Sequence, residues 1–122
     1  MKDNFYNAYV ECALWSSCYE EDGVDNPFDD GEHELSESAK ERMEKDCDVF
    51  RKKFGKLYLQ NGWSDEQAGH DFWLTRNGHG AGFWDRNEIC DNENIRDKLS
   101  DGARTFGECN LYVGDDGLIY CE

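Results

Sequence analysis

The chain has 122 residues, including 28 acidic and 13 basic side chains, and its formal net charge is −15 at pH 7. This length fits one domain with a single hydrophobic core, so we expect residues 1–122 to fold as one unit. The charge disfavours direct binding to nucleic acid or to an anionic membrane, because both would repel the protein. No apolar run is long enough to span a bilayer, and we expect a soluble, cytoplasmic protein with positively charged partners.

Six cysteines stand at positions 12, 18, 47, 90, 109 and 121. An even number could form three disulfides in a small secreted protein. Here no secretion signal pattern precedes them and no Cys-x-x-Cys pair occurs. We therefore expect reduced thiols, most of them buried as small apolar groups.

Two segments in the first half of the chain have the spacing of amphipathic helices. Residues 4–16 form the first, which Asp3 or Asn4 can cap. The second follows a capping box at Ser38 to Glu41 and ends at Asn61-Gly62. The apolar positions are Tyr6, Tyr9, Val10, Ala13 and Leu14 in the first helix, widened by Phe5 and Trp15, and Ala39, Met43, Cys47, Phe50, Phe54 and Leu57 in the second.

An acidic segment, residues 19–48, follows the first helix and overlaps the start of the second. It holds thirteen acidic and three basic side chains, and thus ten of the fifteen net negative charges. Residues 17–37 lack periodicity and predict a loop, and such charge runs are usually solvated and partly mobile. Alternatively, spaced carboxylates can imitate a phosphate backbone and occupy the DNA site of a protein. The candidate contact residues are Asp29, Asp30, Glu32 and Glu34.

The second half of the chain predicts two more helices and a hairpin. Ser64 to Gln67 forms a capping box for a helix that ends near Arg76, and Asn94 can cap a helix that ends at Gly107. Residues 111–113 and 118–120 flank a Gly-Asp-Asp-Gly turn, as in a hairpin, and residues 73–76 and 83–85 could add strands to it. The predicted fold is α+β, with about four helices packed on a small antiparallel sheet.

The segment from His70 to Arg86 combines aromatic, glycine and histidine residues. Exposed aromatics among polar groups are typical of recognition surfaces, although most large aromatics in a small domain are buried. The glycine-rich turn after Arg76 could bind an anion, but it lacks the residues of a P-loop. The candidate binding residues here are Trp73, Arg76, Asn77, His79, Phe83, Trp84 and Arg86.

An adjacent His-Asp pair in this segment also suggests a metal site. His70, Asp71, His79 and Asp85 could converge if the glycine-rich turn folds back on the preceding helix. The alternative is structural, with His70 bonded to backbone and Asp71 paired with Arg76 or Arg86. No motif places a nucleophile beside a base, which favours a non-enzymatic protein without a cofactor over a small metal- or nucleotide-binding hydrolase.

Residues 8–17 (AYVECALWSS), 68–86 (AGHDFWLTRNGHGAGFWDR) and 111–120 (LYVGDDGLIY) resemble a family of small proteins of tailed bacteriophages and prophages. The resemblance implies expression in a bacterial cell and brings no established activity, and it does not extend to the acidic segment. The resulting hypothesis is a cytoplasmic, non-enzymatic protein that binds and modulates a host protein with a basic surface. A nucleic-acid-handling host protein, inhibited by DNA mimicry, is the specific form of this hypothesis.

Overall fold

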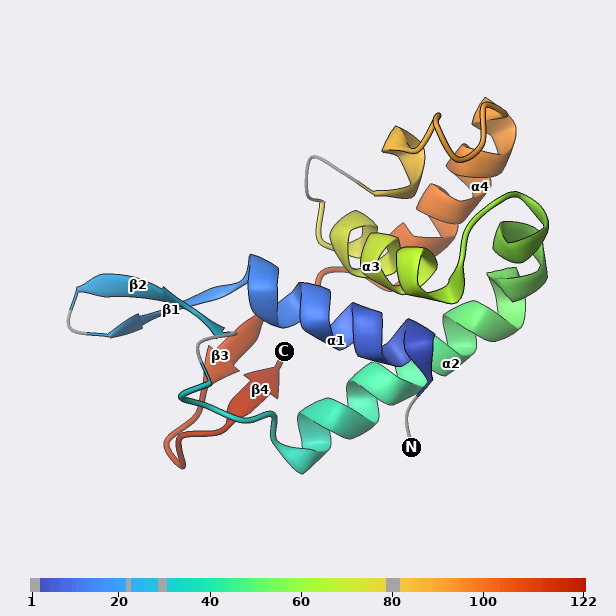
Figure 1. Ribbon diagram of the computed structural model, residues 1–122. Helices are drawn as coiled ribbons and strands as arrows, with labels where there is room; N and C mark the ends of the chain where they lie inside the picture. The colour runs from blue at the N-terminus through green and yellow to red at the C-terminus, as the bar shows by residue number, and fades with distance from the viewer. Residues whose placement is uncertain (1–2, 22, 29–30, 79–81) are drawn as a thin grey trace.

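A computed structural model describes residues 3–21, 23–28, 31–78 and 82–122 (Figure 1). Four α-helices, one 3-10 helix and two antiparallel hairpins make up these ranges, which confirms the predicted α+β class. No helix in the described ranges combines the length and apolar character needed to cross a membrane. The elements are α1 (Asn4–Ser16), β1 (Cys18–Glu21), β2 (Val24–Pro27), α2 (Glu37–Gln60), α3 (Asp65–Arg76), η2 (Phe83–Asp85), α4 (Glu93–Arg104), β3 (Leu111–Val113) and β4 (Ile119–Cys121).

Each α-helix begins at a polar side chain that accepts a hydrogen bond from the first turn; these residues are Asp3, Ser36, Ser64 and Asn92. The predicted caps Ser38 and Asn94 are therefore wrong by two residues. Ser36 has an extended backbone because its N–H donates to Ile119 O at 2.8 Å, which places the turn into α2 before Ser38. Because Ser36 and Ile119 are far apart in the sequence, the local capping pattern could not predict this contact.

Helices α1 and α3 cross in close contact, and α2 runs along the opposite side of the core (Figure 1). A Cβ atom at Gly69 would collide with the Phe5 carbonyl, so glycine allows the two backbones to approach. Phe72 of α3 stacks on Phe50 of α2 with ring centroids 4.4 Å apart. The predicted stripe of α2 is confirmed at its first four positions, which are buried.

Trp15 does not join this core, contrary to expectation, and is 63% exposed. At roughly 100° per residue, Trp15 lies about 200° around α1 from the buried Ala13. Trp73 of α3 instead packs at the C-terminal end of α1, where its Nε1 donates to Ser16 Oγ at 2.8 Å. Trp15 shares its face of α1 with Glu11, one turn earlier.

Two separate hairpins replace the single sheet that was predicted. The expected loop over residues 17–37 contains the β1–β2 hairpin, which projects away from the helices (Figure 1). The C-terminal hairpin of β3 and β4 is confirmed. The added strands are wrong, because residues 73–76 form the last turn of α3 and residues 83–85 form η2. The C-terminal hairpin is completed instead by Leu35, which bridges to Ile119.

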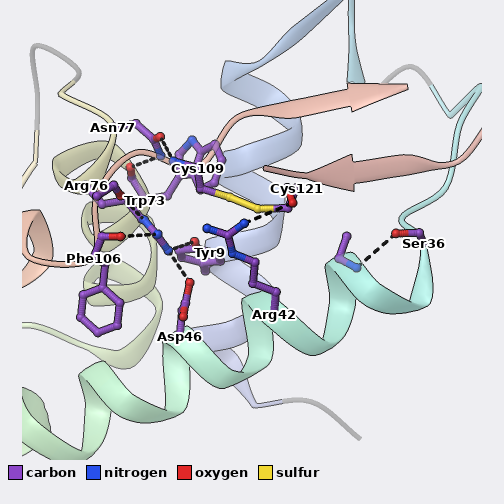
Figure 2. The surroundings of a disulfide bond; sticks show 12 residues. Tyr9, Ser36, Arg42, Asp46, Trp73, Arg76, Asn77, Phe106, Cys109 and Cys121 are labelled. Carbon is purple, nitrogen blue, oxygen red and sulfur yellow. Dashed lines mark hydrogen bonds and ion pairs between the residues drawn. A yellow bond between two sulfur atoms is a disulfide. The ribbon is translucent and has the colours of Figure 1, made fainter. Parts of the chain in front are cut away.

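A disulfide between Cys109 and Cys121 corrects the expectation of six reduced thiols. It closes the C-terminal hairpin beside α1 (Figure 2). The other four cysteines are free, and three of them, Cys12, Cys47 and Cys90, are buried as expected. Cys18 is the exposed one.

Candidate functional site

The aromatic residues of the His70–Arg86 segment mostly lie in the core. Trp73 and Phe83 are buried, so the hypothesis that they form a binding platform is corrected. Trp73 meets the Tyr9 ring edge-on at 5.4 Å, and Phe83 stacks on Phe50 at 5.6 Å. Trp84 alone among the three remains accessible, with 41% of its surface exposed.

Arg76 is buried too and is not available to a ligand. Its guanidinium donates to Asp46 Oδ2 at 2.8 Å and to the Tyr9 hydroxyl at 3.0 Å (Figure 2). It also donates to the carbonyls of Phe106 and Gly107. These contacts neutralise the charge of Arg76 and join three helices to the segment that follows α4, which makes it a structural residue.

The polar residues around the glycine-rich turn have different surroundings. Asn77 accepts from Cys109 N at 2.7 Å and donates to Trp73 O, so it anchors the end of α3. Phe83 N donates to Thr75 Oγ1, which draws the returning chain against α3. His79, one of the predicted ligands, lies outside the described residues, as do Asp29 and Asp30.

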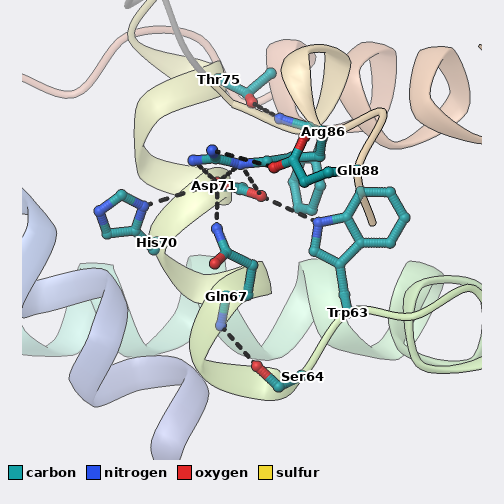
Figure 3. Close-up of polar contacts among 9 residues, drawn as sticks. Trp63, Ser64, Gln67, His70, Asp71, Thr75, Arg86 and Glu88 are labelled. Atoms are coloured by element: carbon teal, nitrogen blue, oxygen red, sulfur yellow. Dashed lines mark hydrogen bonds and ion pairs between the residues drawn. The ribbon is translucent and has the colours of Figure 1, made fainter. Parts of the chain in front are cut away.

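Asp71 is the centre of a buried polar network (Figure 3). Arg86 donates to both carboxylate oxygens, with Nε and Nη2 at 2.8 to 3.1 Å. Trp63 Nε1 donates to Oδ2 at 3.0 Å, and Gln67 Nε2 donates to Oδ1 at 3.0 Å. These donors occupy the carboxylate, and its hydrogen bonds raise the pKa of Arg86 above its ordinary value.

The predicted metal ligands do not form a cluster among the residues that the structure describes. His70 Nδ1 lies 3.7 Å from Asp71 Oδ1, which is too long for a hydrogen bond. Asp85 is exposed, and no group of three or more His, Cys, Asp or Glu side chains in the described ranges is arranged to hold a metal ion. The Asp71–Arg86 pairing is instead the structural alternative that the sequence suggested.

An open pocket of about 530 Å³ lies between α1 and the first turns of α3, next to the Asp71 network, with which it shares Gln67 and Arg86. This α1–α3 pocket is large enough for a ligand group, since ligand pockets commonly measure about 300–1,000 Å³. Residues of both helices and of the segment after η2 line it, among them Glu11, Cys12, Trp15, Glu66, His70 and Arg86. The exposed indole of Trp15 and the imidazole of His70 have centroids 6.5 Å apart.

Sequence reasoning found Arg86 and His70 but missed Glu11, Trp15 and Glu66. A usable signal was present, because Glu11 and Trp15 are four residues apart on one helix face. That face also includes Ala8 and Cys12, both in the pocket lining. The hydrophobic pattern of residues 4–16 led instead to an interior position for Trp15.

The acidic segment forms a second candidate surface. Its exposed carboxylates among the residues whose side chains are described include Asp25, Glu32, Glu34, Glu37, Glu41 and Asp48. His33 Nδ1 donates to Gly117 O at 2.7 Å, and Ile119 N donates to Glu34 O at 2.7 Å. These bonds hold residues 33–36 against the C-terminal hairpin, so this part of the segment has a defined backbone course.

Comparisons with protein-family models, with curated proteins and with solved structures gave no match. The similarity to tailed-phage proteins therefore stays a prediction, and the two surfaces are characterised by their geometry and charge.

Proposed function

We propose that this protein acts without catalysis, by binding the basic surface of a host protein through its acidic segment. The observation that carries the proposal is the concentration of ten of the fifteen net negative charges in residues 19–48. Charge of one sign on one segment raises the rate of encounter with an oppositely charged surface and selects against acidic partners.

The arrangement of the acidic segment supports this proposal. At one end, the buried Phe28 packs on Tyr19 with ring centroids 5.2 Å apart, and its N–H donates to Ser17 O. At the other end, residues 33–36 are bonded to β4. Carboxylates on an anchored backbone lose less conformational freedom on binding than those of an unattached chain, which favours affinity. The choice of a bacterial cell as the setting comes from the predicted resemblance of residues 8–17, 68–86 and 111–120 to phage proteins.

The specific form of the proposal is inhibition by imitation of nucleic acid. Carboxylates spaced along a surface can pair with the same arginine and lysine side chains that bind phosphates. The competing hypothesis, a hydrolase that uses His70, Asp71, His79 and Asp85, has less support. Asp71 already accepts four hydrogen bonds from Arg86, Trp63 and Gln67 in addition to a weaker contact from Arg86 Nε, which leaves little capacity for a metal ion or a substrate.

The experiment is a capture from bacterial lysate at low and high salt, followed by binding kinetics with the purified partner. A triple variant, Asp25→Asn, Glu32→Gln and Glu34→Gln, removes three exposed charges of the segment. Its matched control, Asp91→Asn, Asp97→Asn and Asp115→Asn, removes three exposed charges elsewhere and has the same net charge. We expect association to slow about tenfold in the first variant only.

A partner whose binding is insensitive to salt, or equally sensitive to both triple variants, would contradict the proposal. Duplex DNA added as a competitor tests the DNA-mimic form separately. Displacement of the partner by DNA supports imitation of nucleic acid, whereas salt-sensitive binding that DNA leaves unchanged restricts the proposal to a basic protein surface.

A further inference from the structure

We infer that the α1–α3 pocket receives an arginine side chain of the partner protein. The inference rests on the proposed function, because it identifies the chemical group that a basic partner would insert. It concerns a different surface from the acidic segment, and the two can be tested separately.

The charge of the pocket favours a cation. Glu11 and Glu66 are exposed carboxylates in its lining, and Arg86 is the guanidinium in that lining. Two guanidinium nitrogens of Arg86 donate to the buried Asp71 carboxylate, so the negative charge of Asp71 compensates the positive charge of Arg86. The pocket therefore has an excess of negative charge at its mouth, in a protein that is strongly negative as a whole.

The hydrogen-bonding groups of the pocket favour a donor. Figure 3 shows His70 with Nδ1 toward Asp71 and its second ring nitrogen directed away from that carboxylate. The Asp71 carboxylate favours a proton on Nδ1, which is buried without a hydrogen-bond partner, and this tautomer leaves Nε2 as an acceptor. A guanidinium has five N–H donors and no acceptor, which complements one imidazole acceptor and two carboxylates.

Trp15 selects the planar cation. It is the most exposed tryptophan among the described residues, and its indole forms part of the pocket wall. An indole is the best aromatic partner for a cation, and a guanidinium can stack flat on it in a way that a lysine ammonium cannot. A large aromatic that is exposed beside a cavity, with carboxylates around it, is an arrangement that favours recognition of such a cation.

The test uses a short glycine-serine peptide with one central arginine, and the same peptide with citrulline, which has the same shape without the charge. Two-dimensional NMR follows the tryptophan indole N–H signals and the backbone amides during titration. We expect the arginine peptide to shift the signals of Trp15, Glu11 and His70, and the citrulline peptide to bind at least about fivefold more weakly.

Variants locate the binding. We expect Trp15→Ala and Glu66→Gln each to weaken arginine-peptide binding by about two- to fivefold. Trp84→Ala, which removes the other well-exposed tryptophan, and Asp97→Asn on α4 should leave it unchanged. All four side chains are exposed, so each variant is expected to keep the native fold, which its NMR spectrum checks directly.

Equal binding of the arginine and citrulline peptides, or shifts that map to the acidic segment and persist in Trp15→Ala, would overturn the inference. Such a result leaves the proposed function standing if the captured partner still binds in a salt-dependent manner. Loss of salt-dependent capture refutes the proposed function instead, whatever the peptide does in the pocket.

Discussion

Asp71 and Arg86 lie fifteen residues apart and form a two-pronged ion pair, in which the carboxylate is fully buried and the guanidinium forms part of the pocket wall. The pair joins α3 to the segment that follows η2, and it holds the Arg86 guanidinium in place as part of the lining of the α1–α3 pocket. The two residues differ in their burial, because the Asp71 side chain has no access to solvent while the Arg86 side chain is 20% exposed.

The first prediction concerns Asp71→Asn. The amide keeps the size of the side chain but removes its charge, and it leaves the partly buried Arg86 with only the distant, exposed Glu88 as an ion-pair partner among the described residues. We expect the free energy of unfolding to fall by about 3 kcal/mol, as measured by urea denaturation. Glu88→Gln is the control, because the exposed Glu88 lies 3.9 Å from Arg86 and should contribute less than about 1 kcal/mol. Equal losses in the two variants would contradict the central place of Asp71.

The second prediction concerns Arg76→Lys. Lysine keeps the positive charge but cannot reproduce the fork that reaches Asp46, Tyr9 and two backbone carbonyls. We expect a loss of about 2–4 kcal/mol in the free energy of unfolding, since the buried Tyr9 hydroxyl and the partly buried acceptors would lose this donor. Arg104→Lys, at an exposed pair with Asp101, should change stability by less than about 0.5 kcal/mol. A tolerated Arg76→Lys would mean that charge alone is sufficient at this position.

The third prediction concerns the disulfide. Cys109 and Cys121 are 12 residues apart, and removal of a bond that closes a loop of this size costs about 2–3 kcal/mol. We expect the variant Cys109→Ala, Cys121→Ala to unfold at lower urea concentration than the oxidised protein. A reductant should lower the midpoint of the wild type and leave that of the double variant unchanged. A wild-type midpoint that is insensitive to reductant would show that the bond does not stabilise the fold.

The fourth prediction is a pH dependence that arises at Cys12. Burial raises the pKa of this thiol from 9.0 to about 12, and the nearby Asp71 carboxylate acts in the same direction. The unfolded chain therefore loses this proton near pH 9 while the native protein keeps it until about pH 12. The stabilising contribution is complete below pH 9 and is lost as pH rises from 9 to 12.

We therefore expect the free energy of unfolding of the wild type to fall more steeply above pH 9 than that of Cys12→Ala, by up to about 1.4 kcal/mol per pH unit. Urea denaturation at a series of alkaline pH values measures the difference in slope. Comparison of slopes removes the constant cost of replacing a buried side chain. Parallel curves for the two proteins would rule out Cys12 as the titrating group.

Local sequence patterns predicted the helices that depend on interactions between residues close together in the sequence. The apolar spacing of Met43, Cys47 and Phe50 defined α2, and the serine at position 64 marked the start of α3, because both effects act within one or two helical turns. The cap at Ser36 was missed because its extended backbone depends on a bond to Ile119, 83 residues further along the chain. The β1–β2 hairpin was missed because its residues are polar and lack the alternation of a half-buried strand.

The candidate site was harder to predict than the fold. Its parts come from α1, α3 and the chain after η2, and their proximity depends on how the helices cross. The composition of the segment between His70 and Arg86 predicted an aromatic binding surface, yet Trp73 and Phe83 are buried in the core. Composition identifies which side chains are large, whereas their direction depends on neighbours that are distant in sequence.

Gly69 lets the main chains of α1 and α3 meet, because a side chain at this position would collide with the Phe5 carbonyl. This contact between the two helices lies outside the residues that line the α1–α3 pocket. Substitutions at the exposed Glu11, Trp15 or Glu66 would change the charge and shape of the lining without touching this backbone contact. The arginine preference that we infer for this pocket is therefore open to change by surface substitution alone, provided that the glycine is retained.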